Sequence, residues 1–120
     1  KHSSIIQITS LGQKFGFKKN PSYQISKAGL AQLTKCAAID FQKKKIRVNN
    51  ICPGYIKTNM TRKNYTNKLK TKERIDRTII KRWGVPDDLV GSVLFLSSKH
   101  SSYINGSTID VDGGWSVSGI

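Results

Sequence analysis

The stretch IRVNNICPG, residues 46–54, decides the fold of this 120-residue chain. Its β-branched and apolar residues predict a short buried strand over residues 46–52, and Pro53-Gly54 predicts the turn that ends it. A long helix-compatible segment precedes this strand, from about Tyr23 to Lys44, with Ser22 as the expected N-cap. A long helix followed closely by a buried strand is typical of α/β proteins.

The same alternation continues in both directions along the chain. Residues 4–9 predict a buried strand before the long helix, residues 86–97 predict a later helix, and residues 107–111 predict a third strand. Strand, helix, strand, helix, strand is the pattern of a parallel sheet covered on both faces. We therefore expect one α/β domain over residues 1–120, with about three strands and three helices.

The apolar residues of the long helix spread around much of its circumference, which predicts burial on two sides. Large exposed apolar patches are rare in monomers, so we expect the second side to meet another subunit in a dimer or tetramer. Trp115 is expected in the core or at the same subunit contact. Cys36 and Cys52 lack metal-ligand spacing, and we expect both to be buried thiols and no metal site.

The chain carries a net charge of +14, and much of it lies in residues 57–82. This basic flap contains ten Lys or Arg against Glu73 and Asp76. Its weak apolar period predicts a mobile segment. Three interpretations remain open: a solvated surface, recognition of an anionic substrate or cofactor phosphate, and contact with nucleic acid. The last is weakest, because no DNA-binding motif is present and few aromatic residues are interleaved with the charges.

Tyr23 and Lys27 are four positions apart at the start of the predicted long helix, so their side chains lie on one helix face. A fixed cation favours the phenolate form of a tyrosine, which suits Tyr23 to proton transfer. Ser10 lies thirteen positions upstream, at the end of the first strand, where its hydroxyl can hydrogen-bond a carbonyl oxygen. Thr9 is the alternative to Ser10. Taken alone, a Tyr-x-x-x-Lys pair more often marks an exposed helix face.

Four segments in this order extend the pattern: IIQITS at 5–10, YQISKAG at 23–29, IRVNNICPG at 46–54 and NGSTIDVDGG at 105–114. Together they resemble the short-chain dehydrogenase/reductase family from end to end. The resemblance implies that the three strands are the last three of a seven-stranded, doubly wound, Rossmann-type sheet, and that the cofactor is NAD or NADP. Family members are about twice as long, and their first half carries a glycine-rich dinucleotide turn that this chain lacks. The chain thus resembles the C-terminal catalytic half, which we expect to be inactive in isolation.

The resemblance also implies a role for individual residues. Ser10 would orient the substrate carbonyl, Tyr23 would donate or accept the proton, and Lys27 would support that proton transfer and bind the nicotinamide ribose. In the turn after the second strand, the Ile56 backbone would meet the nicotinamide carboxamide and Thr58 would offer its hydroxyl. The residues that the resemblance places at the cofactor are Tyr23, Lys27, Pro53, Gly54, Ile56 and Thr58.

The expected activity is interconversion of a secondary alcohol and a ketone. Segments 82–89, 103–106 and 113–115 look similar to the branch that acts on sugar acids or polyols, and 3-oxoacyl-[acyl-carrier-protein] reductase is the alternative. A non-catalytic basic fragment that contacts nucleic acid or an acidic protein is the alternative from another class. No run approaches the roughly 20 apolar residues of a membrane span, so we expect a cytoplasmic protein.

Overall fold

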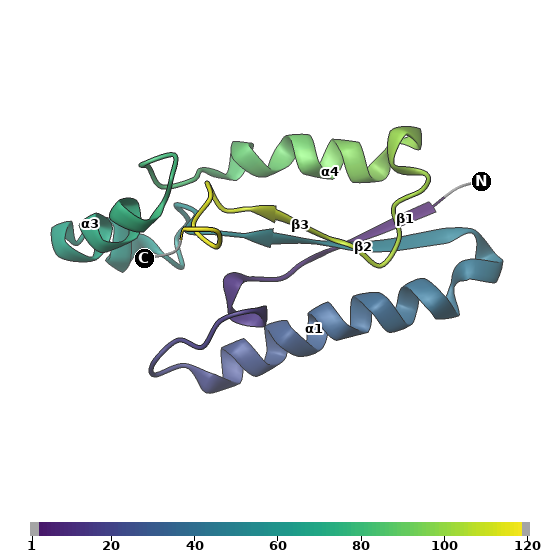
Figure 1. Cartoon of the computed structure of the whole chain (residues 1–120), viewed down its shortest axis with the longest axis horizontal. Coiled ribbons are helices and arrows are strands. Elements are labelled where there is room, and N and C mark those ends of the chain that lie inside the picture. Colours follow the sequence, from purple (N-terminus) through teal and green to yellow (C-terminus); the bar gives the residue numbers. More distant parts are fainter. Residues whose placement is uncertain (1–2, 119–120) are drawn as a thin grey trace.

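The computed structural model describes residues 3–118 and contains one three-stranded parallel sheet (Figure 1). The strands β1 (Ser3–Ile8), β2 (Ile46–Pro53) and β3 (Thr108–Val111) lie in the order β1-β2-β3. Ser3 pairs with Ile46 and Asn50 pairs with Thr108. Helix α1 (Pro21–Asp40) covers one face of the sheet and α4 (Val90–Ser97) covers the other. The predicted α/β class with a parallel sheet is confirmed.

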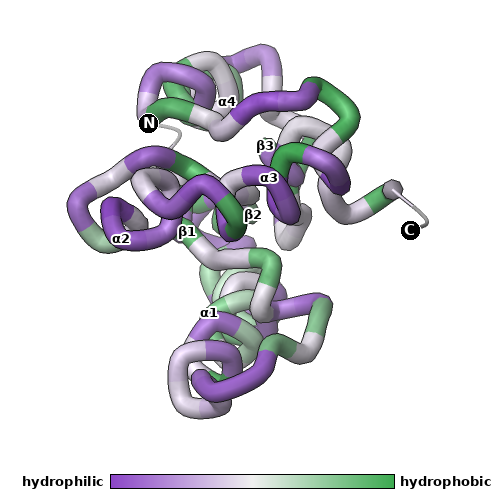
Figure 2. Tube along the Cα trace, turned by 90° about the vertical axis from the view of Figure 1, so that its left-hand side faces the viewer, coloured by the Kyte–Doolittle hydropathy of each residue, from purple (hydrophilic) through white to green (hydrophobic). Residues whose placement is uncertain are grey.

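The chain from β2 to α4 forms a separate lobe beyond the carboxyl ends of the strands. It contains α2 (Arg62–Tyr65) and α3 (Lys68–Arg77), and all three strands point toward α3 (Figure 1). Viewed from this end, α2 and α3 are largely hydrophilic (Figure 2). With the single turn of α2, the described residues contain four α-helices rather than three. The short 3₁₀ turns are Leu11–Gln13, Gln42–Lys44, Pro86–Leu89 and Lys99–Ser101.

The middle strand β2 forms the core of the sheet because both of its faces are covered. Val48, Ile51 and Cys52 are fully buried. The buried amide of Asn49 is satisfied on both sides, since its nitrogen donates to the Ile104 carbonyl at 3.0 Å and its oxygen accepts from a backbone N–H at 3.0 Å. Buried polar groups of this kind cost stability unless they are paired, so Asn49 ties β2 to the segment that leads into β3.

Helix α1 begins two residues earlier than the sequence predicted. Asn20 is its N-cap and Pro21 its first residue, so the expectation that Ser22 caps the helix is wrong. Proline suits the first position because its φ angle is already helical and its missing N–H would have no partner there. The helix ends at Asp40, before the predicted end at Lys44, and Lys45 then turns the chain with a positive φ of 56°.

The sheet covers only one side of α1. Thr34 and Ala38 are its buried residues, whereas Ile25, Leu33 and Ile39 are 71%, 52% and 68% exposed. The prediction that Cys36 is buried is wrong. Position 36 is two residues from both Thr34 and Ala38, so its side chain points about 200° away from the buried side of the helix. Within this chain, the second apolar side of α1 is uncovered.

Trp115 lies in the core of the chain rather than on its surface. It forms a buried cluster with Leu11 and Cys52. Phe15, Phe17 and Tyr55 pack around the indole, with ring centroids 5.5–5.8 Å from its own. Burial raises the pKa of the Cys52 thiol to about 11. This cluster joins β2, the loop after β1 and the chain after β3.

No helix among residues 3–118 has the length and apolar character that crossing a membrane requires.

Candidate active site

A cleft of about 430 Å³ opens beyond the carboxyl ends of the strands, between α1 and the basic flap. This is the end of an open α/β sheet at which ligands bind, and the volume lies within the range of small-molecule sites. The loop after β1, the start of α1, the turn after β2 and the flap all contribute. Its lining residues include Ser10, Tyr23, Gly54, Tyr55, Thr61 and Arg74.

The structure distinguishes between the two candidate hydroxyls after β1. Ser10 lines the cleft and caps the following 3₁₀ turn, where its Oγ accepts a long hydrogen bond of 3.4 Å from the Gly12 N–H. Thr9 is buried, and its hydroxyl lies 3.0 Å from Asn50 Oδ1 and 3.1 Å from the Ile51 carbonyl. The hydroxyl available to a ligand in the cleft is therefore that of Ser10.

Tyr23 and Lys27 lie together in the first two turns of α1. Tyr23 lines the cleft, and the Lys27 Nζ lies 5.8 Å from the centroid of its ring. The same Nζ donates a hydrogen bond of 2.9 Å to the Ile8 carbonyl at the end of β1. That bond fixes the ammonium between α1 and the sheet. An ammonium has three donors, so two protons remain for a ligand or water.

Gln24 holds the loop that borders this part of the cleft, a role that the sequence did not predict. Its Oε1 accepts from the Phe17 N–H at 2.7 Å, and its Nε2 donates to the Phe17 carbonyl at 2.6 Å. The paired bonds tie residues 14–20 to the helix that carries Tyr23. Only the position of Gln24 next to Tyr23 could have drawn attention to it.

Gly54 occupies the point where the turn after β2 approaches β3 most closely. Its N–H donates to the Val111 carbonyl at 3.0 Å, and an added Cβ would lie 2.6 Å from the Asp112 Cα. Any larger side chain would therefore force the two segments apart. Of the four turn residues expected at the cofactor, Pro53, Gly54, Ile56 and Thr58, only Gly54 lines the cleft itself.

Ile56 and Thr58 lie beside the cleft, and Ile56 forms a short parallel bridge with Gly84. Gly84 pairs with the backbone on either side of Ile56, so the N–H and carbonyl of Ile56 point away from Gly84. The carbonyl accepts from the Thr61 hydroxyl at 2.6 Å, whereas the N–H donates to no other described residue. Thr58 is exposed, and its Oγ1 lies 3.2 Å from Thr61 Oγ1.

Two arginines attach the flap to the aromatic cluster, and neither was singled out from the sequence. The Arg77 guanidinium carbon lies 3.8 Å from the Trp115 ring, and its Nε donates to the Trp115 carbonyl at 3.3 Å. The Arg74 guanidinium carbon lies 4.8 Å from the Tyr55 ring centroid. Burial raises the pKa of Tyr55, although both guanidinium charges act in the opposite direction. Their spacing of three residues on one helix was the available signal.

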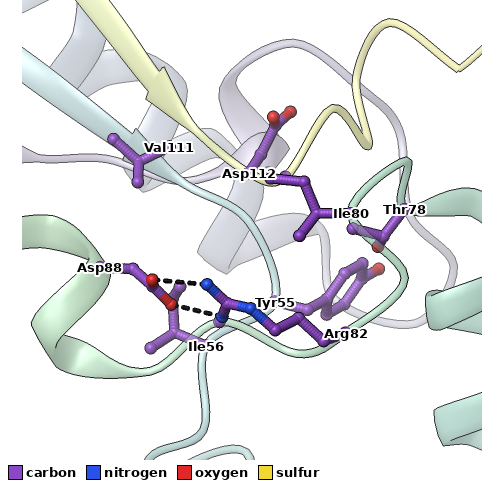
Figure 3. Close-up of a pocket in the computed structure, with 10 residues that line it drawn as sticks. Tyr55, Ile56, Thr78, Ile80, Arg82, Asp88, Val111 and Asp112 are labelled. Atoms are coloured by element: carbon purple, nitrogen blue, oxygen red, sulfur yellow. Dashed lines mark hydrogen bonds and ion pairs between the residues drawn. The ribbon is translucent and has the colours of Figure 1, made fainter.

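A second cavity, of about 140 Å³, lies behind Tyr55 (Figure 3). Arg82 and Asp88 both line it and form two hydrogen bonds of 2.7 Å with each other (Figure 3). The Arg82 guanidinium and the Val85 N–H hold the pKa of Asp88 well below its ordinary value. Because these two charges satisfy each other and the volume is small, the pair anchors the end of the flap to the segment before α4.

Comparison with known proteins gives the same class as the fold. A sequence model for a family described as enoyl-(acyl carrier protein) reductase matches residues 1–116. The chain is 43% identical over 111 residues to 2-dehydro-3-deoxy-D-gluconate 5-dehydrogenase of Escherichia coli, covering 92% of this chain and 44% of that protein. It is 42% identical over 115 residues to the 3-oxoacyl-[acyl-carrier-protein] reductase of Rickettsia bellii, covering 95% and 46%.

Comparison with solved structures gives the same class of protein as comparison of sequences. A gluconate 5-dehydrogenase from Burkholderia cenocepacia, in complex with NADP and tartrate, matches with a TM-score of 0.94 and 32% identity, over 97% of this chain and 46% of that one. The chain belongs to the short-chain dehydrogenase/reductase family, whose members use NAD or NADP. It spans less than half the length of these relatives.

Proposed function

We propose that the full-length protein containing this chain is an NAD(P)-dependent oxidoreductase that interconverts a secondary alcohol and a ketone on a sugar acid. The observation that carries the proposal is one cleft lined by Ser10 and Tyr23, with the Lys27 ammonium fixed beside the Tyr23 ring. A hydroxyl donor, a phenol and a cation converge there at the end of the sheet where ligands bind.

In the direction of reduction, the substrate carbonyl oxygen lies between two hydroxyl groups. The Ser10 hydroxyl donates a hydrogen bond that orients the carbonyl, and the Tyr23 phenol transfers its proton to the same oxygen. The Lys27 ammonium favours the phenolate that this transfer leaves behind. In the oxidative direction, Tyr23 accepts the alcohol proton. General acid/base catalysis of this kind contributes about 10²- to 10⁴-fold in rate.

The residues around the cleft fit the nicotinamide end of a dinucleotide. Lys27 has two ammonium protons available for ribose hydroxyls, and the Ile56 N–H makes no hydrogen bond to another described residue. Gly54 lines the cleft and allows the turn after β2 to pack closely against Asp112, which fixes the backbone at the floor of the cleft. The nicotinamide, when bound, supplies or accepts the hydride. Pro53 and Thr58 shape and flank this turn rather than line the cleft.

A sugar acid is the favoured substrate class. The E. coli relative is named for a deoxy-sugar acid and the B. cenocepacia structure for gluconate, and that structure also contains tartrate, a hydroxy dicarboxylic acid. The second candidate is 3-oxoacyl-[acyl-carrier-protein] reduction. The R. bellii relative favours it, the description of the family model also names an acyl carrier protein, and a basic flap suits an acidic carrier protein.

Steady-state reduction by the full-length protein tests both candidates. We expect NADH or NADPH oxidation with 5-keto-D-gluconate at a kcat/KM at least tenfold above that with acetoacetyl-acyl-carrier-protein. The reverse ranking would select the second candidate. Absence of cofactor oxidation with both ketones and with a panel of other sugar acids and polyol-derived ketoses would overturn the proposed activity.

We also propose that the full-length protein is a symmetric oligomer, with the uncovered side of α1 at a subunit interface. Leu33 is half-exposed there between Ile25 and Ile39, and closed two-fold assemblies commonly bury such surfaces. Leu33→Glu should split the assembly, whereas Gln42→Glu, at an exposed position of the 3₁₀ turn after α1, should leave it intact. Light scattering measures the difference, and a wild-type monomer would contradict the proposal.

A further inference from the structure

Arg74 is the one cation of the basic flap that reaches the cleft. Among the residues of 57–82, all of which the structure describes, ten are Lys or Arg, and Arg74 alone of these lines the cleft with Ser10 and Tyr23. Its side chain is 22% exposed. A charge so far removed from water requires acceptors, which the chain supplies only in part.

The donors of Arg74 are incompletely used within the chain. Nη1 donates to the Lys70 carbonyl at 2.9 Å, whereas Nε is buried with no hydrogen-bond partner among the described residues. Glu73 is a weak partner, because its carboxylate lies 3.9 Å away and is largely exposed. A guanidinium presents a planar fork of donors that matches a carboxylate. The unused donors of Arg74 therefore indicate an acceptor that comes from outside the chain.

The orientation of Arg74 is fixed by its neighbours. Its guanidinium stacks on Tyr55, whose ring packs between Trp83 and Trp115 at 5.6 Å from each. A stacked guanidinium loses little freedom when it forms further hydrogen bonds. Arg77 and Lys18, also near the cleft, add positive potential, and no Asp or Glu is among the residues that line it. The local field therefore favours an anion over a neutral polyol.

We infer that Arg74 binds the carboxylate of the substrate and sets the preference of the cleft for acidic over neutral sugars. The inference rests on the proposed function and assigns its substrate recognition to one side chain. Arg74 lies on the flap, whereas Ser10 and Tyr23 lie on the sheet side. The carboxylate and the reacting carbonyl are thus held from opposite sides of the cleft.

A matched pair of substrates tests the inference. 5-Keto-D-gluconate and L-sorbose differ only in that the carboxylate of the first is a hydroxymethyl group in the second. In the full-length protein, Arg74→Gln should lower kcat/KM for 5-keto-D-gluconate about 10- to 100-fold, mainly through KM, because a charged hydrogen bond is lost. For L-sorbose the change should stay below about threefold. Lys68→Gln removes the same charge from an exposed position of α3 and is the control.

A second variant and a binding measurement separate the possible outcomes. Arg74→Lys keeps the positive charge but lacks the planar fork of guanidinium donors. It should recover part of the kcat/KM for 5-keto-D-gluconate that Arg74→Gln loses. Equal loss on both substrates, or no loss on either, would overturn the inference. Calorimetry with D-gluconate and D-glucitol reads recognition without turnover: wild-type protein should bind only the acid, and Arg74→Gln should bind neither. Selective binding without catalysis would support the inference while the proposed activity fails. Failure of wild-type protein to prefer gluconate would overturn the inference.

Discussion

The two sides of the cleft are built in different ways. The sheet side, with Ser10, Tyr23 and Lys27, adjoins buried residues, and Lys27 bonds directly to the backbone of β1. The flap side is made by α2 and α3, neither of which has a buried residue. Its attachments include two guanidinium groups stacked on aromatic rings, the Arg82–Asp88 pair, and a backbone bond from the Ile80 N–H to the Gly113 carbonyl at 3.1 Å.

This difference suits the two sides of the cleft to the different roles that we propose for them. Proton transfer requires atoms held within a few tenths of an ångström, which a side bonded to a sheet provides. Admission and closure over a substrate require a segment of low local stability, which exposed helices with few packed apolar contacts provide. We therefore expect changes on the sheet side to alter kcat, and changes on the flap side to alter binding and exchange rates.

The largest expected effect is on the sheet side. Tyr23→Phe in the full-length protein should lower kcat at least about 100-fold, because the hydroxyl that carries the proton is lost. Cofactor affinity should remain within about twofold of wild type. Lys27→Ala should reduce both kcat and the affinity for the cofactor. Tyr103→Phe, at a fully exposed tyrosine, is the control. Stopped-flow turnover measures kcat, and fluorescence titration measures the affinity for the cofactor. Near-normal turnover of Tyr23→Phe would contradict the proposed mechanism.

A smaller effect is expected when the flap is detached. Arg77→Gln removes the cation that lies 3.8 Å from the Trp115 ring, an interaction worth about 0.5–2 kcal/mol. Amides of residues 68–77 should then exchange with solvent about 2- to 30-fold faster. Amides of β2 should be unaffected, because that strand does not depend on the flap. Hydrogen exchange of the full-length protein is the measurement, and equal acceleration in β2 would show general destabilisation instead.

Ligand binding should slow hydrogen exchange in the flap, whereas Arg77→Gln should accelerate it. With saturating cofactor and substrate, exchange in residues 57–82 should slow by roughly fivefold, as expected for a segment that closes over a ligand. Residues 48–52 should change little, since they are already buried in β2. The same hydrogen-exchange experiment with cofactor alone separates the two contributions. A flap that is equally protected in all three states would contradict the proposed closure.

The smallest effect is expected from the exposed charges of the flap. The combined variant Lys63→Gln, Lys68→Gln and Lys72→Gln removes three cations whose residues are exposed and do not line the cleft. KM for 5-keto-D-gluconate should change by less than about twofold at physiological salt, where screening acts over about 8 Å. A larger, salt-dependent rise in KM would show that the overall charge of the flap, rather than Arg74 alone, attracts the substrate.

Much of the fold could be predicted because it depends on local pattern. The three strands were placed to within one residue of their observed bounds, since β-branched runs closed by Gly or Pro are local signals. The helix bounds were less accurate. Asn20 and Ser22 are both acceptable caps, and only Pro21 between them favours the earlier start. For the flap, the weak apolar period predicted a mobile segment and did not locate α2 or α3.

The sequence by itself determined the βαβ alternation, the placement of Tyr23 and Lys27 on one face of a helix, and the family to which the chain belongs. These depend on residues within a few positions of each other or on motifs in a fixed order. The tertiary structure alone showed that Ser10 and not Thr9 faces the cleft, that Trp115 is in the core, that Cys36 is exposed, and that Arg74 among ten flap cations reaches the site. Each of these depends on contacts between segments far apart in the chain. Helical or strand periodicity shows which residues share a face, but not which segment will cover that face.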